Sequence, residues 1–187
     1  GFAAQRIDLD AFWGDADVLI ARCDQVERDA FLYRDFQSRN IMVTDDGLRF
    51  IDYQSGRRGA RAYDLASLVM DAKAGLDWSM KDALMQHYMD AAGLSSASDR
   101  ARFLEEMVPF AILRLLQALG AFGNLGGRQG KPGFVSSIPP ALETLATLAE
   151  RAPLLRELDC LSRLFRTLPE SVSPHRCMVP AWSSPNS

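Results

Sequence analysis

Three side chains near the start of the sequence have the types and the spacing of a phosphate-transfer site. Asp35 is followed after four residues by Asn40, and Asp52 lies twelve residues beyond Asn40. Two short apolar runs, 41–43 and 48–51, lie between Asn40 and Asp52 and flank an Asp-Gly turn, which is a strong hairpin signal. Because a hairpin returns its second strand beside its first, Asp52 is expected next to Asn40, with Asp35 on the adjoining loop.

Carboxylate and amide oxygens are hard ligands of the kind that Mg²⁺ takes, and Mg²⁺ completes its coordination with water and substrate phosphates. A carboxylate that is not bound to the metal, here that of Asp35, can accept the proton of an attacking hydroxyl. Phosphoryl transfer needs these parts. Asp and Asn are also common in turns and caps, so each residue alone has an ordinary structural interpretation. Their joint spacing around a hairpin favours the chemical one.

The elements that must position these residues are mostly helical. A single hairpin is marginally stable by itself, so we expect it to pack on the helices. Gly75 and Gly93 are expected to end two of the helices, Pro109 to kink or divide the longest one, and the Gly-rich segment 123–133 to form a loop. The apolar spacing predicts helices over residues 10–28, 60–75, 78–93, 98–122, 139–151 and 154–167. These elements make one domain over residues 1–168, and the Pro- and Ser-rich residues 169–187 are expected to form a disordered or loosely attached tail.

The spacing matches the protein-kinase signature H-R-D-x-x-x-x-N followed by D-F-G. It is written here as Tyr33-Arg34-Asp35 with Asn40, and then as Asp52-Tyr53-Gln54. A segment Tyr63-Asp64-Leu65-Ala66 follows. With these motifs the sequence resembles the aminoglycoside phosphotransferase and choline kinase family, which has a protein-kinase-like fold. The subgroup that it looks most similar to includes bacterial kinases of cell-wall amino sugars.

The resemblance implies a mainly α (α+β) fold, the C-terminal lobe of a kinase-like enzyme, with the catalytic loop and metal motif in residues 31–56. It implies that Asp35 is the catalytic base and that Asn40 and Asp52 hold Mg²⁺ and, through it, ATP. Arg34 and Asp64 are implied as structural support, with Asp64 accepting hydrogen bonds from the loop backbone. Tyr33 departs from the family's His, and we interpret it as a tolerated change that packs under the loop.

Arginines supply candidate contacts to an anionic group of the substrate. Arg57 and Arg58 follow the metal motif and could bind such a group, or they could lie on a solvated loop or pair with local acids. Arg114 lies in an otherwise apolar helix, where a cation needs a partner. A carboxylate of the domain itself is favoured as that partner over a substrate anion.

Composition limits the remaining possibilities. The net charge of −3 argues against general nucleic-acid binding, and three scattered cysteines do not form a disulfide framework. No uninterrupted apolar run reaches the roughly 18 residues that span a bilayer, and the first residues do not show a basic segment followed by an apolar one. We therefore expect a cytoplasmic protein whose partner is a small molecule with a hydroxyl acceptor, without nucleic-acid or membrane binding.

The parts that hold ATP in such kinases are missing from the sequence. It contains no G-x-G-x-x-G, and none of its lysines, Lys73, Lys81 and Lys131, lies in a β-branched run. The chain thus resembles a C-terminal lobe without its N-terminal ATP lobe, and we expect little activity from it alone and exposed apolar surface near the hairpin. Three functions stay open: an amino-sugar kinase acting with that lobe, a non-catalytic binding or regulatory module, and a Mg²⁺-dependent hydrolase.

Overall fold

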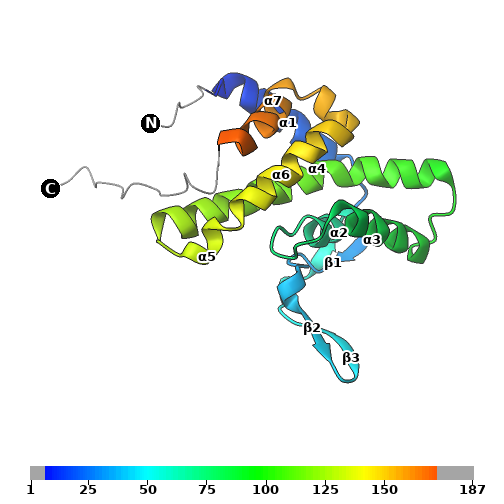
Figure 1. Ribbon diagram of the computed structural model, residues 1–187. Coiled ribbons are helices and arrows are strands. Elements are labelled where there is room, and N and C mark those ends of the chain that lie inside the picture. Colours follow the sequence, from blue (N-terminus) through cyan, green and yellow to red (C-terminus); the bar gives the residue numbers. More distant parts are fainter. Residues whose placement is uncertain (1–6, 172–187) are drawn as a thin grey trace.

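The computed structural model describes residues 7–171, and most of this part of the chain is helical (Figure 1). The α-helices are α1 (Leu9–Asp24), α2 (Arg61–Val69), α3 (Trp78–Ala91), α4 (Ala97–Phe122), α5 (Pro132–Val135), α6 (Ile138–Arg151) and α7 (Asp159–Ser171). The strands are β1 (Ala30–Leu32), β2 (Ile41–Thr44), β3 (Gly47–Phe50) and β4 (Arg57–Gly59). Short turns of other helix types are η1 (Ser38–Asn40), η2 (Gly123–Arg128) and η3 (Pro153–Arg156).

Side-chain caps explain where several helices begin. Asp8 accepts hydrogen bonds from the backbone N–H of Asp10 and Ala11 at the start of α1, both at 3.1 Å. Asp77 does the same for Met80 at the start of α3, at 2.8 Å. At the other end of α3, Gly93 has a left-handed φ of 72° directly after the C-cap, so the expected glycine stop is confirmed there.

The long helix α4 is the centre of the packing, and it runs across the molecule between two groups of elements (Figure 1). It packs against α2 on one side and against α1 and α6 on the other. Pro109 was expected to kink the helix or to divide two helices, and because it lies fully buried inside the single helix α4, the second alternative is wrong. Both halves of the helix bury apolar residues such as Met107 and Phe110 in one core, and that burial outweighs the single backbone hydrogen bond that proline removes.

The segment Ala97–Arg128 is long and apolar enough, by length and composition alone, to cross a membrane. The sequence prediction counted only uninterrupted apolar runs, and Arg114 interrupts this one. A long helix in the core of a soluble protein passes the same test, and α4 has several of its apolar side chains buried against its neighbours. The finding is therefore weak evidence for a membrane span.

Within residues 7–171 the strands form two separate two-stranded antiparallel sheets. In the first, β1 pairs with β4 in the register Ala30↔Gly59. Strand β4 was not expected from the sequence, because its Arg-Arg-Gly sequence has no apolar alternation. Helix α1 ends at Asp24 rather than at residue 28, and this leaves a short connection into β1.

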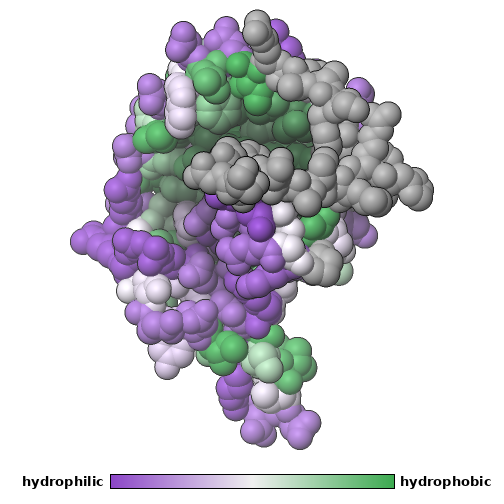
Figure 2. All heavy atoms as spheres, turned by 90° about the vertical axis from the view of Figure 1, so that its left-hand side faces the viewer, coloured by the Kyte–Doolittle hydropathy of each residue, from purple (hydrophilic) through white to green (hydrophobic). Residues whose placement is uncertain are grey.

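The second sheet is the expected hairpin, with β2 and β3 paired from Ile41↔Phe50 to Thr44↔Gly47. It projects from the helical body (Figures 1 and 2) instead of packing on it, so that expectation is wrong. Most of its apolar side chains are exposed, with Val43 at 83% and Leu48 at 55%. Contacts at the base hold it in place, including the backbone N–H of Ile51 on the carbonyl of Asn40 at 3.1 Å. The apolar surface expected near the hairpin is present.

Three further boundaries differ from the prediction. Helix α2 ends at Val69, so Gly75 does not cap it, although Gly75 does adopt a left-handed φ of 64° in the following turn. The Gly-rich segment continues α4 as the π-helical turn η2 instead of forming a loop throughout. Helix α7 extends to Ser171, so residues 169–171 are helical and not part of the expected tail. The rest of that tail, 172–187, lies outside the described residues.

Candidate active site

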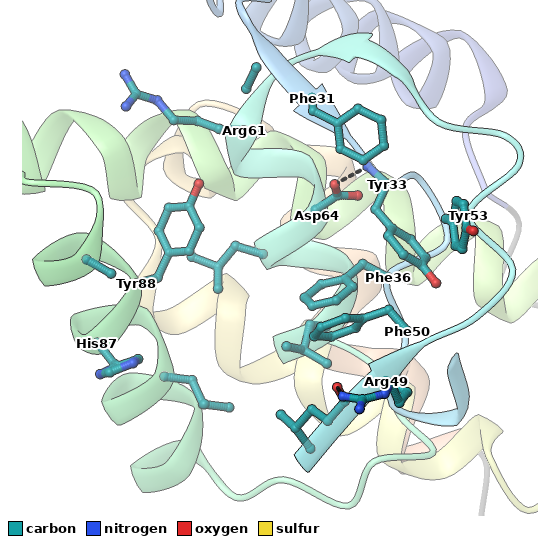
Figure 3. Close-up of a pocket in the computed structure, with 16 residues that line it drawn as sticks. Phe31, Tyr33, Phe36, Arg49, Phe50, Tyr53, Arg61, Asp64, His87 and Tyr88 are labelled. Atoms are coloured by element: carbon teal, nitrogen blue, oxygen red, sulfur yellow. Dashed lines mark hydrogen bonds between the residues drawn. The ribbon is translucent and has the colours of Figure 1, made fainter. Parts of the chain in front are cut away.

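Asp64, on the first turn of α2, holds the loop that carries Asp35. Its carboxylate accepts a hydrogen bond from the backbone N–H of Tyr33 (Figure 3) and another from that of Arg34, at 2.8 Å. Burial raises the pKa of the Asp64 carboxyl, while these two hydrogen bonds and the nearby Arg114 act to lower it. The resemblance implies this pair of contacts, and the part that Asp64 plays in a working site stays a prediction.

The backbone takes the left-handed conformation at two non-glycine residues, and both border the site. Arg34 has a φ of 84° and Asp52 has a φ of 69°. Such conformations cost of order 1–3 kcal/mol for a side chain with a Cβ and persist where the surroundings impose them. At Arg34 the residue directly precedes Asp35, so the unusual backbone sets the direction in which that carboxylate leaves the loop.

Asn40 and Asp52 come together at the base of the hairpin, as the sequence predicts. Asn40 is buried, at 6% exposure, and its side-chain amide donates to the carbonyl of Asp35 at 2.8 Å. This bond uses the nitrogen and leaves the amide oxygen of Asn40 as an available ligand. Asp52 follows Ile51, whose N–H is bonded to the Asn40 carbonyl, and its exposed carboxylate accepts a hydrogen bond from Gln54 at 2.6 Å.

An amide oxygen and a carboxylate at this position fit Mg²⁺, which takes few protein ligands and several from water or phosphates. A cluster of three or more His, Cys, Asp or Glu able to hold a metal by itself is absent from residues 7–171. The donor set is therefore suited to a metal that arrives with a phosphate, and poorly suited to a permanently bound structural ion.

Tyr33 occupies the position of the family's His and ties the loop to the hairpin. Its hydroxyl donates to the carbonyl of Ile51, and its ring contacts Phe36 and Tyr53. Desolvation, followed by the charges of Asp52, Tyr53, Asp35 and Asp64, raises the pKa of the Tyr33 phenol, so it remains a protonated donor. A tyrosine in this position thus connects the loop that carries Asp35 to the backbone that precedes Asp52.

Asp35 is half-buried and faces Arg114 of α4. The Arg114 guanidinium lies 4.0 Å from the Asp35 carboxylate, and it is held by Tyr63 at 3.0 Å and by Gln117 at 2.8 Å. It also lies over the ring of Tyr63, 5.3 Å from the centroid. The partner of Arg114 is thus a carboxylate of the domain, the alternative that the sequence favours, and this carboxylate is that of the proposed base.

Two hollows border the loop on different sides. The one beside Asp35, here called the acceptor pocket, has a volume of about 250 Å³. Its lining residues come from the catalytic loop, the end of α2, α4, η2 and α5; those used below are Asp35, Arg39, Ser67, Asp71, Lys73 and Phe134. Sequence reasoning missed Lys73 and Ser67, because they approach Asp35 only through the packing of α2 against α4.

The second hollow, here called the aromatic groove, has a volume of about 710 Å³ and lies between the hairpin, the loop and α3. Figure 3 shows Tyr33, Phe36 and Phe50 along one side and His87 and Tyr88 of α3 on the other. Its lining is largely apolar, and Asp35, Asn40 and Asp52 are not part of it. The chemistry of the motif therefore belongs to the acceptor pocket and the hairpin base.

Arg57 and Arg58 lie on β4. Neither lines the acceptor pocket or the aromatic groove, and Arg58 donates to the carbonyl of Arg28 at 2.8 Å. Strand pairing with β1 fixes their backbone, which is why a loop interpretation of this pair is wrong. Among the three arginines proposed as substrate contacts, Arg114 is the one that the structure places beside Asp35.

Comparison with known proteins agrees with the motifs. The model of the phosphotransferase enzyme family matches residues 3–105, which include the loop, the hairpin, α2 and α3. A search of curated proteins gave no match. The matched part covers more than half of the chain, and the mainly helical architecture is that of the C-terminal lobe of a kinase-like fold. The chain belongs to the phosphotransferase enzyme family, the aminoglycoside phosphotransferase and choline kinase group that its motifs resemble.

Proposed function

We propose that the protein transfers the γ-phosphate of ATP to a hydroxyl of a small molecule. One observation carries this proposal: Asp35 lines a small pocket, and Asn40, whose amide bonds the Asp35 carbonyl, is paired at the base of the hairpin with the residue that precedes Asp52. An acceptor in the pocket and a phosphate at the hairpin base would then lie on two sides of the same loop. In-line transfer requires the attacking and leaving oxygens to lie roughly in line with the transferred phosphoryl group.

Each residue has a defined part in this reaction. Asp35 accepts the proton of the acceptor hydroxyl as its oxygen attacks, and Arg114 keeps that carboxylate in position. The Asn40 oxygen and the Asp52 carboxylate would hold Mg²⁺. When bound there, the metal would neutralise charge on the phosphates. Arg34 and Asp64 fix the backbone of the loop, so that Asp35 needs no rearrangement before the reaction.

The acceptor is proposed to be an amino sugar such as N-acetylglucosamine or N-acetylmuramate. The motifs resemble kinases of cell-wall amino sugars, and a pocket of about 250 Å³ suits one sugar ring better than an oligosaccharide. The sequence lacks a Gly-rich turn and a strand lysine, so we also propose that an ATP-holding lobe outside these 187 residues completes the site.

The test is ATP consumption by the full-length protein with a panel of N-acetylmuramate, N-acetylglucosamine, choline and aminoglycosides. Turnover is expected with an amino sugar, and Asp35→Ala is expected to lower kcat about a hundredfold or more. Asp45→Ala, in the exposed hairpin turn, is the matched control. Undiminished turnover in Asp35→Ala would exclude this residue as the base, and Mg²⁺-dependent phosphatase activity without ATP would favour a hydrolase.

A further inference from the structure

We propose that Asp71 is a positioning residue of the catalytic loop: it holds Ser38 and, through Ser38, keeps Asn40 and Asp35 in the geometry that phosphate transfer needs. This inference rests on the proposed function, because it concerns the reaction of the same site. It goes further by giving a part in that reaction to a residue outside the motifs, at the far end of α2. The hydrogen bonds of the loop carry it.

Asp71 has a fixed place beyond the end of α2. It directly follows Met70, the C-cap of that helix. Its backbone N–H donates to the carbonyl of Leu68 at 3.3 Å, and its own carbonyl accepts from the N–H of Ala74 at 3.0 Å. One carboxylate oxygen, Oδ1, also accepts from the backbone N–H of Lys73 at 3.0 Å. The residue is therefore held by its own turn, and Oδ2 remains for the loop.

The contact with the loop is made through Ser38, the first residue of η1. Oδ2 of Asp71 accepts hydrogen bonds from the Ser38 hydroxyl at 2.7 Å and from the Ser38 backbone N–H at 3.2 Å. Gln37, the N-cap of this turn, makes no capping hydrogen bond with its side chain. Asp71 thus supplies from a distant part of the chain the acceptor that the cap does not supply. Hydrogen bonds to an ionised carboxylate are about twice as strong as those between neutral groups.

Ser38 is the point at which residues 36–40 are attached to the helical body. Within residues 7–171, the hydrogen bonds that join this segment to the chain beyond β4 are the two from Ser38 to Asp71. The Arg39 side chain donates none, and the carbonyl of Asn40 accepts from Ile51 of the hairpin instead. Removing the Asp71 carboxylate would therefore release this half of the loop from the helices.

A displacement of Ser38 would reach the reacting groups directly. Asn40 is the last residue of the same turn, and its backbone N–H donates to the carbonyl of Gln37 at 2.9 Å. Its side-chain amide donates to the carbonyl of Asp35 at 2.8 Å. These bonds close residues 35–40 into one unit. The proposed base and the proposed metal ligand would therefore move together with Ser38.

Asp71 and Asp64 hold the loop at its two ends. Asp64, on the first turn of α2, accepts from the backbone N–H of Arg34 at 2.8 Å, and Asp71 accepts from Ser38. The two aspartates are seven residues apart, which is close to two helical turns, so both can face the loop from one helix. Asp35 lies between the two attachment points.

The test compares Asp71→Ala with Asp77→Ala in the full-length protein. Asp77 caps α3 by accepting from a backbone N–H, so both changes should lower the thermal unfolding temperature by several degrees. Asp71→Ala should in addition lower kcat about ten- to a hundredfold, with the KM of the acceptor changed less than about threefold. Asp77→Ala should leave kcat unchanged. An unchanged kcat in Asp71→Ala would overturn the inference.

Ser38→Ala distinguishes positioning from a direct contact with the acceptor. Asp71 lines the acceptor pocket, whereas Ser38 does not. Loss of the Ser38 hydroxyl should lower kcat about three- to tenfold in the parent and should have no further effect in Asp71→Ala, where its partner is already gone. The same fold loss in both backgrounds would show that the two residues act independently, which contradicts the inference.

Hydrogen–deuterium exchange measures the loop without depending on turnover. Asp71→Ala should speed exchange in residues 36–41 and leave the hairpin turn, residues 44–47, unchanged, while Asp77→Ala should change neither. Unchanged loop exchange would overturn the inference even if ATP is consumed. Absence of ATP consumption with every acceptor would overturn the kinase proposal, and faster loop exchange in Asp71→Ala would in that case still support Asp71 as the attachment of the loop.

Discussion

At the scale of single residues, the catalytic loop depends on backbone geometry that few side chains adopt easily. Arg34 has a left-handed φ, and its N–H is bonded to Asp64, so the loop cannot relax without losing that hydrogen bond. The same residue immediately precedes Asp35. The proposed base is therefore positioned by strain that Asp64 sustains from α2, and changes at either residue should be measurable in stability as well as in activity.

Substitutions at Arg34 should distinguish the effect of its backbone conformation on stability from the effect of its side chain. Glycine accepts a positive φ, so Arg34→Gly should keep the free energy of unfolding within about 1 kcal/mol of the parent. A β-branched residue does not, and Arg34→Val should lose about 1–3 kcal/mol. Urea denaturation measures both, and equal stability of the two variants would contradict the role given to the backbone.

Asp64 should leave a signature in the pH dependence of stability. Burial raises its pKa in the folded protein, so the folded state binds the proton more tightly than the unfolded state does. The resulting stabilisation is complete below the usual carboxyl pKa of about 4 and is lost as pH rises through the higher folded value. Asp64→Asn removes this titration.

The stability of Asp64→Asn relative to the parent should therefore improve as pH rises from about 3 to about 6. Urea denaturation at a series of pH values measures this trend, and Asp45→Asn in the exposed hairpin turn is the control. A relative stability that falls with pH would show that hydrogen bonds to the charged carboxylate outweigh its burial.

The sequence was informative where chemistry and local geometry coincide. The spacing of Asp35, Asn40 and Asp52 predicts their neighbourhood because a two-stranded hairpin allows one return path. It could not reveal Lys73 or Ser67, since their approach to Asp35 depends on how α2 packs against α4. It also could not reveal that Arg57 and Arg58 lie on strand β4, because the sequence Arg-Arg-Gly has no apolar alternation.

At the scale of elements, the turn η2 and helix α5 form a wall of the acceptor pocket. The sequence favours a loop there because of its glycines, yet η2 extends α4 with π-type hydrogen bonding, a form that is frequent at functional sites. At one of these positions, Gly126, there is no room for a side chain. A Cβ on Gly126 would lie 2.7 Å from a methyl carbon of Val135 and 3.1 Å from its backbone nitrogen, so η2 and α5 approach closely at this point.

Neighbouring glycines give a matched test of that approach. Gly126→Ala should lower the free energy of unfolding by about 1–3 kcal/mol, because backbone as well as side chain must move. It should also weaken sugar binding, since α5 carries Phe134. Gly127→Ala has nothing within 4 Å of the added carbon and should be neutral or slightly stabilising. Thermal unfolding and titration of both variants measure the effect, and similar losses would exclude a steric origin.

At the scale of the whole molecule, the hairpin is an exposed apolar projection. Val43 and Leu48 are cross-strand neighbours, and both are exposed. Apolar side chains on a strand whose outer edge is unpaired favour self-association. The largely apolar aromatic groove begins at the same hairpin, because Leu48 lines it, so the two apolar surfaces adjoin each other.

Polar substitution on the hairpin should improve solubility without a cost in stability. The pair Val43→Thr and Leu48→Thr keeps β-propensity, removes no buried contact and should change the free energy of unfolding by less than about 1 kcal/mol. Self-association of the 187-residue chain at high concentration should fall. Sedimentation velocity measures this, with Leu145→Thr in the core as a contrasting variant that should unfold the protein. Unchanged self-association would show that a surface other than the hairpin mediates it.

The hairpin also has a mechanical consequence. Asn40 and Asp52 lie at its base, and the strands extend from that base with few restraints along their length. The hairpin therefore resembles a lever that pivots at its base, next to the two proposed metal ligands. A displacement at the tip would be transmitted to the base and would change how the two oxygens face each other. A molecule bound at the tip would therefore act on the spacing between Asn40 and Asp52 without touching either residue.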